Sequence, residues 1–170
     1  MTLRRAKTNS DDPAAVGAAL DAAADEVRAA TAELRDLVAG IHPAILTNRG
    51  LRAAIEALTA RAPAAVEIDV PAGERWPAHV ESTIYFFIAE ALTNVAKHAP
   101  EAHACVRVAA VDGALQAEVS DDGSGGADPA RGSGLRGMED RLGAAGGTFS
   151  ITSPTGRGTV LRACVPLDLG

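Results

Sequence analysis

The residues with the clearest chemical potential lie between positions 90 and 98, where the chain reads Glu-Ala-Leu-Thr-Asn-Val-Ala-Lys-His. Helical spacing places Glu90, Asn94 and Lys97 in one stripe, and His98 lies beside it. A carboxylate and a carboxamide offer oxygen ligands to a hard cation, and an ammonium group can neutralise a phosphate bridged to that cation. The stripe therefore indicates a magnesium nucleotide site. By itself it is also typical of an ordinary solvated helix face.

Two glycine clusters follow this predicted helix and strengthen the nucleotide interpretation. The first comes directly after a predicted strand and contains Asp121, Gly123 and Gly125. A carboxylate there can accept a hydrogen bond from an exocyclic amine, and glycines allow the backbone to approach a flat base. The second cluster, residues 132–137, runs into a helical pattern whose free amide groups would face an anion. Either cluster alone is equally consistent with a glycine-rich turn.

The acid-amide helix and the two glycine clusters, in this order, resemble the motifs of the GHKL ATPases. Within that superfamily they resemble the catalytic ATP-binding domain of two-component sensor histidine kinases. Residues 90–99 are similar to the N box, residues 121–125 to the G1 box and residues 132–137 to the G2 box. The resemblance extends over residues 45–167, which is most of the chain.

Two further segments narrow the resemblance to one type of kinase. Residues 134–142 read Gly-Leu-Arg-Gly-Met-Glu-Asp-Arg-Leu. They are similar to the Gly-Leu-x-Gly-Met-x-x-Arg signature of the nitrate-sensor and desaturase-sensor kinases, whose dimerisation hairpin is of the HisKA_3 type. Residues 41–46 resemble the segment that leads into the catalytic domain of those proteins.

The resemblance implies ATP and Mg²⁺ as ligands and gives a role to each residue of the acid-amide helix. Asn94 would ligate magnesium. Glu90 would also serve the metal, by ordering its water shell, or would assist as a base. Lys97 and His98 would contact phosphates. The γ-phosphoryl group would pass in line to a histidine nitrogen.

The resemblance also implies how the nucleotide's base and phosphates would be held. Asp121 would accept from the adenine amine, and Thr159 would support the base directly or through a water. Residues 126–133 would form a short lid. Gly126 departs from the related kinases, which often have a bulky apolar residue there, so the lid should start more loosely. The remaining expected nucleotide contacts are Gly123, Gly125, Gly132, Gly134, Leu135 and Gly137.

The alternation of helical and strand patterns predicts an α/β sandwich, in which helices cover one face of a mixed sheet. The resemblance implies the same fold, the Bergerat-type sandwich, here preceded by an N-terminal helix. The predicted helices cover residues 51–61, 77–99 and 135–145, and the predicted strands cover residues 66–70, 104–111, 114–120, 147–152 and 158–166. The inward face of the second helix should carry Ile84, Phe87, Ile88, Ala91, Leu92 and Val95.

The N-terminal part of the chain divides into a predicted tail over residues 1–12 and a predicted helix plus linker over residues 13–44, with the catalytic domain over residues 45–170. A seven-residue apolar repeat in this helix indicates a seam that packs against something. The seam can pack on its own domain, or the helix can be the second helix of a kinase dimerisation hairpin, which would make the parent protein a homodimer. We prefer the hairpin interpretation.

A phosphoacceptor histidine is not recognisable in this sequence. In the related kinases it lies on the first hairpin helix beside an acidic residue, and nothing before Asp12 resembles that pattern. His42 is followed by Pro43 and has no acidic neighbour, so it is interpreted as a linker residue. The acceptor histidine is therefore expected outside this chain, and a response regulator is the expected final recipient of the phosphoryl group.

Composition excludes several classes of function. The chain has 170 residues and a net charge of −6, and no basic cluster offsets the repulsion that a nucleic acid would meet. No apolar stretch is long enough for a bilayer, and the N-terminus lacks the apolar core of a signal peptide. A soluble, cytoplasmic piece without a membrane segment is expected, and a membrane-anchored parent stays open.

Two alternatives from other classes remain. A protein-serine kinase of the anti-sigma-factor type shares the ATP site, but the heptad helix and the His42-Pro43 segment argue against it. A non-catalytic nucleotide-binding or dimerisation module would have lost its chemistry. Glu90, Asn94 and Asp121 are all present, which counts against such a loss.

Overall fold

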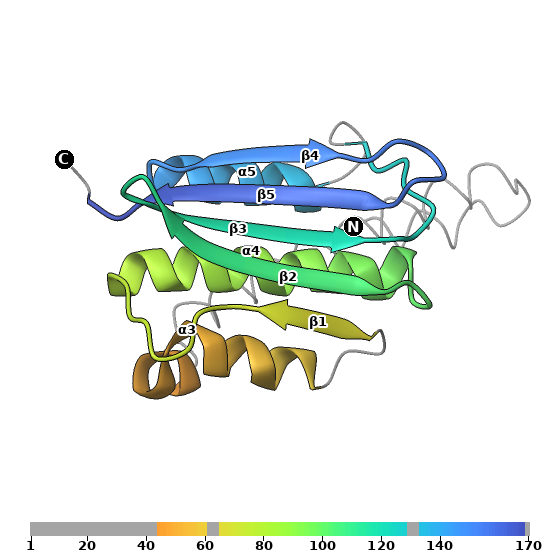
Figure 1. Ribbon diagram of the computed structural model, residues 1–170. Coiled ribbons are helices and arrows are strands. Elements are labelled where there is room, and N and C mark those ends of the chain that lie inside the picture. Colours follow the sequence, from red (N-terminus) through yellow and green to blue (C-terminus); the bar gives the residue numbers. More distant parts are fainter. Residues whose placement is uncertain (1–43, 61–64, 129–132, 169–170) are drawn as a thin grey trace, which may run out of the picture. The chain divides into compact units, whose positions relative to one another are not determined.

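The computed structural model describes residues 44–60, 65–128 and 133–168 (Figure 1). The tail predicted over residues 1–12 lies outside the described residues, as does the segment predicted over residues 13–44 except for its last residue. The described helices are α3 (Ala44–Thr59), α4 (Ala78–His98) and α5 (Ser133–Ala144). The described strands are β1 (Val66–Asp69), β2 (Ala104–Val111), β3 (Ala114–Asp121), β4 (Thr148–Thr152) and β5 (Thr159–Pro166).

The strands form one sheet in the order β1-β2-β3-β5-β4. Strand β1 runs parallel to β2, and every other neighbouring pair is antiparallel. Helices α4 and α5 lie behind the strands in Figure 1, and α3 packs against α4. The predicted α/β sandwich with a mixed sheet is therefore confirmed.

The core lies between the sheet and α4 because alternate residues of each strand face the helices. The buried strand residues are Ala104, Val106, Val108, Leu115, Ala117, Val119, Leu161, Ala163 and Val165. The six α4 residues predicted to face inward are all buried. A single apolar stripe on α4 therefore fixes which way its polar residues, including Asn94 and His98, are presented.

Helix α3 consists of two helical segments joined at a kink at Gly50, where φ is 80°. The segment after Gly50 is the helix predicted from residue 51, whereas the segment from Ala44 to the kink was not predicted. A Cβ atom added at Gly50 would lie 3.0 Å from the Arg75 side chain. Gly50 also has a positive φ, which glycine adopts more readily than other residues. Arg75 in turn donates to Glu81, a carboxylate that is 2% exposed. Side chains from distant parts of the chain therefore pack beside this kink, and periodicity cannot predict such contacts.

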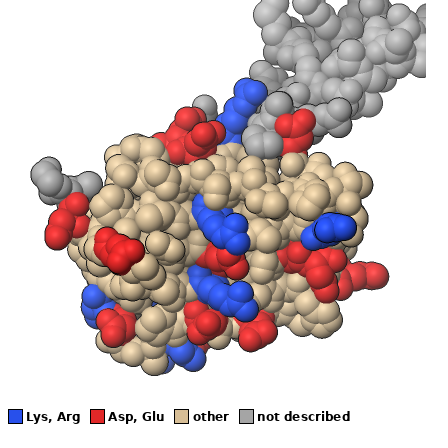
Figure 2. Space-filling view, turned by 45° about the horizontal axis from the view of Figure 1, so that its top comes forward, with Lys and Arg blue, Asp and Glu red and all other residues tan. Residues whose placement is uncertain are grey.

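None of the described helices covers the other face of the sheet, which we call the open face. It carries a row of alternating charges, the charge ladder, formed by Asp69, Arg107, Glu118 and Arg162. These residues are register partners on four neighbouring strands. Arg162 Nε donates to Glu118 Oε2 at 2.7 Å, and Arg107 lies 3.6 Å from Glu118 and 4.0 Å from Asp69. Figure 2 shows basic and acidic side chains alternating over this face.

None of the helices in the described ranges is long and apolar enough to cross a bilayer.

Candidate functional site

The candidate site is a cavity of about 410 Å³ between the sheet, the last turns of α4 and the first turn of α5. Small-molecule sites commonly enclose about 300 to 1,000 Å³, so this volume suits a ligand of that class. Its apolar wall is formed by Ala91, Val95, Ala99, Val119, Leu135 and Leu161. Its polar and backbone lining is formed by Asn94, His98, Asp121, Ser124, Gly125, Gly126, Ala127, Asp128, Gly134 and Thr159.

Asp121 and Thr159 lie side by side on the sheet wall of this cavity. They are register partners, at the end of β3 and the start of β5. Each is two residues from a buried core residue of its strand, so both side chains project from the helix-facing side. The Asp121 carboxylate accepts from the backbone N–H of Gly123 at 2.9 Å through Oδ1. In the described part of the chain its second oxygen has no protein hydrogen-bond partner, so it is available to a ligand donor.

Three glycines allow the loop after β3 to pack closely on its neighbours. A methyl group at Gly158 would overlap the carbonyl oxygen of Asp121, and one at Gly125 would overlap the carbonyl oxygen of Pro154. Both residues also have φ between 61° and 73°, a region that side chains disfavour. At Gly123 a methyl group would lie 2.6 Å from the Ala99 side chain. Gly123 does not line the cavity, and its glycine is explained by packing.

The opposite wall comes from helices α4 and α5. Asn94 and His98 face the cavity from α4, and Gly134 faces it from α5. Glu90 lies one turn before Asn94, and its Oε1 is 3.3 Å from the position that a methyl group on Gly134 would occupy. The glycine therefore lets the start of α5 approach the Glu90 carboxylate closely. The first amide groups of a helix have no partner within the helix, and α5 begins beside this cavity.

Not every predicted site residue reaches the cavity. Lys97 is exposed at the end of α4, and neither it nor Gly137 lines the cavity wall. Gly132 lies outside the described residues, as do residues 129–132 of the predicted lid. The structure thus brings together Asn94, His98, Asp121, Gly125, Gly134, Leu135 and Thr159, with Glu90 at the edge.

The donor set fits a magnesium nucleotide better than a metal held by protein alone. In the described ranges no three histidine, cysteine or acidic side chains are grouped closely enough to hold a metal. Magnesium commonly keeps several waters and takes one or two protein oxygens together with substrate phosphates. Asn94 and Glu90, one helical turn apart, offer that small number of oxygens.

Sequence reasoning missed Ser153, which follows β4. Its hydroxyl lies 2.9 Å from the Thr159 hydroxyl and accepts from the backbone N–H of Ala127 at 2.9 Å. Its carbonyl oxygen accepts from the N–H of Gly126 at 3.0 Å. No local pattern marks Ser153, because its partners lie more than 20 residues earlier or on the following strand.

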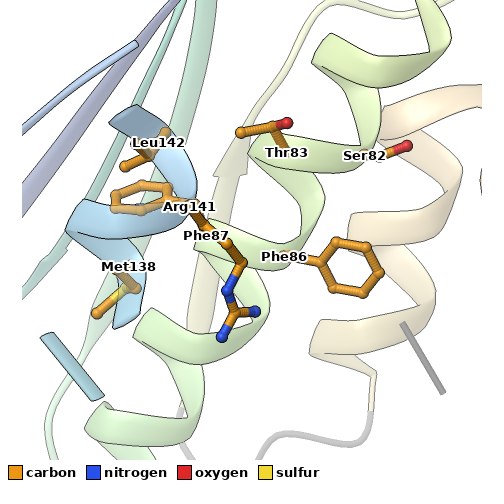
Figure 3. A pocket seen from close by; sticks show the side chains of 7 residues that line it. All are labelled: Ser82, Thr83, Phe86, Phe87, Met138, Arg141 and Leu142. Carbon is orange, nitrogen blue, oxygen red and sulfur yellow. The ribbon is translucent and has the colours of Figure 1, made fainter. Parts of the chain in front are cut away.

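A second cavity, of about 100 Å³, lies between α4 and α5 (Figure 3). Met138, Arg141 and Leu142 of α5 line it together with four residues of α4, namely Ser82, Thr83, Phe86 and Phe87. Its volume is below the roughly 300 Å³ at which small-molecule sites begin. None of the predicted site residues reaches it, so the nucleotide interpretation attaches to the larger cavity.

Comparison with known proteins agrees with this geometry. Residues 79–169 match the family described as histidine kinase-, DNA gyrase B-, and HSP90-like ATPase. The chain is 40% identical over 85 residues to the sensor histidine kinase YxjM of Bacillus subtilis, covering 49% of this chain and 21% of that protein. It is 30% identical to the sensor histidine kinase MctS of Rhizobium johnstonii, covering 96% of this chain and 37% of that protein.

Among solved structures, the chain is similar to the histidine kinase domain of the blue-light activated histidine kinase of Erythrobacter litoralis. The two are 25% identical with a TM-score of 0.57, over 68% of this chain and 58% of that one. The chain thus spans well under half of the two curated relatives and a little over half of this domain. The resemblance read from the three boxes and the HisKA_3-associated signature is confirmed. This chain belongs to the histidine kinase-, DNA gyrase B- and HSP90-like ATPase family, as an ATP-binding domain of the sensor histidine kinase type.

Proposed function

We propose that this chain is the catalytic part of a sensor histidine kinase that transfers the γ-phosphoryl group of ATP to a histidine outside the chain. One observation carries the proposal. Asp121 and Thr159 are paired on one wall of the cavity, and Asn94 and His98 face it from α4. A pair suited to a base and a pair suited to a metal and phosphates would therefore share one cavity, whose volume suits a small molecule.

Each side chain has a role that its position supports. Asp121 accepts from the adenine amine with its unpartnered oxygen, and Thr159 contacts the neighbouring part of the base. Asn94 binds Mg²⁺, and Glu90 orders the water on the metal or assists as a base. Mg²⁺ held by these two residues would supply positive charge against the transferring phosphoryl group.

The phosphates have a separate set of contacts. His98 lines the cavity, and Lys97 precedes it at the exposed end of α4. The amide groups at the start of α5 add partial positive charge at the same end. Lys97 lies outside the cavity wall, so it reaches a phosphate only as a flexible cation from the rim.

The remaining parts of the proposal concern the cell. A response regulator receives the phosphoryl group from the histidine, and the helix predicted over residues 13–44 makes the full protein a homodimer. ATP as donor implies a cytoplasmic site. These points follow from the named relatives, which are sensor histidine kinases, and from the sequence.

The test is phosphoryl transfer in the full-length protein with γ-labelled ATP and Mg²⁺, next to its Asn94→Ala variant. We expect label that is lost in acid and kept in alkali, as a phosphohistidine is, and no label in the variant. Label stable in acid would instead indicate the serine kinase alternative. Intact ATP binding without any label would indicate a non-catalytic module.

A further inference from the structure

Ser153 contacts two parts of the candidate site that are far apart in sequence. Through its hydroxyl and its carbonyl oxygen it holds the consecutive amides of Gly126 and Ala127, where the predicted lid begins. The same hydroxyl lies 2.9 Å from that of Thr159 on the cavity wall. A third bond, from the N–H of Gly156 to the carbonyl oxygen of Ser124 at 2.6 Å, ties the same two loops together.

The hydrogen-bonding capacity of these groups limits what the Ser153 hydroxyl can do. A hydroxyl has one hydrogen to donate and two lone pairs to accept with. The Ala127 amide, which can only donate, already occupies one lone pair of Ser153. Between Ser153 and Thr159 either oxygen can be the donor. The ligand that meets Thr159 therefore decides the direction of this bond.

Adenine offers a donor and an acceptor next to each other, its amine and its ring nitrogen N1. With the amine on Asp121, the register partner Thr159 stands next to N1. Where the two meet directly, Thr159 donates to N1, so Ser153 donates to Thr159. The bonds run in one direction, from the Ala127 amide through the two hydroxyls to the base. Guanine reverses both groups, since it carries a carbonyl oxygen and an N1 hydrogen there.

We propose that Ser153 is a positioning residue that holds the Thr159 hydroxyl where it can donate to adenine N1, and that it ties Thr159 to the loop after β3. The inference rests on the proposed function, because it needs an adenine nucleotide in the cavity. Ser153 touches no ligand itself. It acts through Thr159 on the contact with N1, and the same hydroxyl joins that contact to the Ala127 amide of the loop after β3.

The test compares Ser153→Ala with Ser150→Ala, the same change at an exposed position on β4. Calorimetry with ATP, GTP and 1-deaza-ATP, which lacks the N1 acceptor, measures affinity and selectivity. Losing one neutral hydrogen bond costs about fivefold in affinity, so Ser153→Ala should bind ATP about fivefold more weakly. Its affinity for 1-deaza-ATP should not fall, and Ser150→Ala should match the parent protein for every nucleotide.

A double variant separates positioning from general support. If Ser153 acts through Thr159, adding Ser153→Ala to Thr159→Val should not lower the preference for ATP any further. Ser153→Thr, which keeps the hydroxyl, should restore that preference. An equal loss of ATP and 1-deaza-ATP affinity, or a loss that persists beside Thr159→Val, would overturn the inference.

The two proposals can fail separately. If the parent chain bound no ATP, the proposed function would fail. If it bound ATP but Ser153→Ala behaved as Ser150→Ala does, only the role of Ser153 would fail. Amide hydrogen exchange at Gly126 and Ala127 gives a second readout, since both should exchange faster in Ser153→Ala and be slowed less by ATP than in the parent chain.

Discussion

Two carboxylates on strand β3, Asp121 and Glu118, lie in different surroundings and have different partners. Glu118 projects from the open face and contacts the guanidinium groups of Arg107 and Arg162. Asp121, three residues later, projects toward the helices, where its described protein partner is a backbone amide. The side chains of a strand alternate between its two faces, so an odd separation places these acids on opposite sides. The carboxylate satisfied by arginines belongs to the framework, and the incompletely satisfied one is available to a ligand.

The largest expected effect comes from adding a side chain at Gly158, where β5 packs closely against the end of β3. Gly158→Ala should lower the free energy of unfolding by about 4 kcal/mol, because a methyl group overlaps the Asp121 carbonyl and φ is positive. Gly156 is the matched control, since its φ of 77° is similar and nothing lies within 4 Å of an added methyl group. Gly156→Ala should cost about 1 kcal/mol. Equal losses in urea unfolding would contradict the close packing of this end.

The second largest effect is on ligand binding. Asp121→Asn turns one carboxylate oxygen into an amide donor, which cannot accept from the adenine amine. Losing a hydrogen bond to a charged group reduces ATP affinity by about 100-fold. Calorimetry measures this change, and thermal unfolding should show that the variant stays folded. Unchanged ATP affinity in a folded variant would remove Asp121 from the site.

The matching change on the open face should affect stability only slightly. Glu118→Gln weakens the charge ladder, whose arginines are more than half exposed. Exposed ion pairs contribute about 0 to 1 kcal/mol each, so unfolding should become easier by about 1 kcal/mol. ATP affinity should stay that of the parent chain. A clear drop in ATP affinity would mean that the two faces are not independent.

The smallest effect concerns Cys105, on the same open face beside the ladder. Burial raises the pKa of its thiol above the ordinary value, Arg107 lowers it, and Glu67, Asp69 and Glu118 raise it further. A raised pKa leaves less thiolate at pH 8, and the thiolate is the form that reacts. In a Cys164→Ser background, iodoacetamide should therefore label Cys105 more slowly in the folded than in the urea-unfolded chain. Faster labelling in the folded chain would contradict the sign of the shift.

The fold was predictable because its signals are local and repeated. The two-residue alternation of β2, β3 and β5 and the apolar stripe of α4 each span several turns or strand positions, and all appear in the structure. The helical segment before Gly50 was not predicted, and a contact that it makes, from Arg75 to the carbonyl oxygen of Thr47 at 3.4 Å, comes from far along the chain. Periodicity reports which residues are buried, but it does not report which distant side chain contacts them.

The candidate site shows the same difference between residues marked by local sequence patterns and residues marked only by distant contacts. Asp121, Asn94, Gly125 and Gly134 could be placed at one cavity from the sequence, because residue type and spacing express their chemistry. Ser153 could not be, because its role depends on two contacts made only in the folded chain. The reason for glycine at position 123 also differs from the predicted one: the residue packs against Ala99 rather than lining the cavity. Motifs therefore indicate the groups that meet a ligand better than the groups that hold them in place.

The most direct test of the central claim is a calorimetric titration of the chain with ATP, ADP and GTP, with and without Mg²⁺, repeated on Asp121→Asn and Glu118→Gln. The cavity account predicts binding that prefers adenine, strengthens with Mg²⁺, is about 100-fold weaker in Asp121→Asn and is unchanged in Glu118→Gln. Equal binding of ATP and GTP, or equal affinity in the two variants, would contradict it.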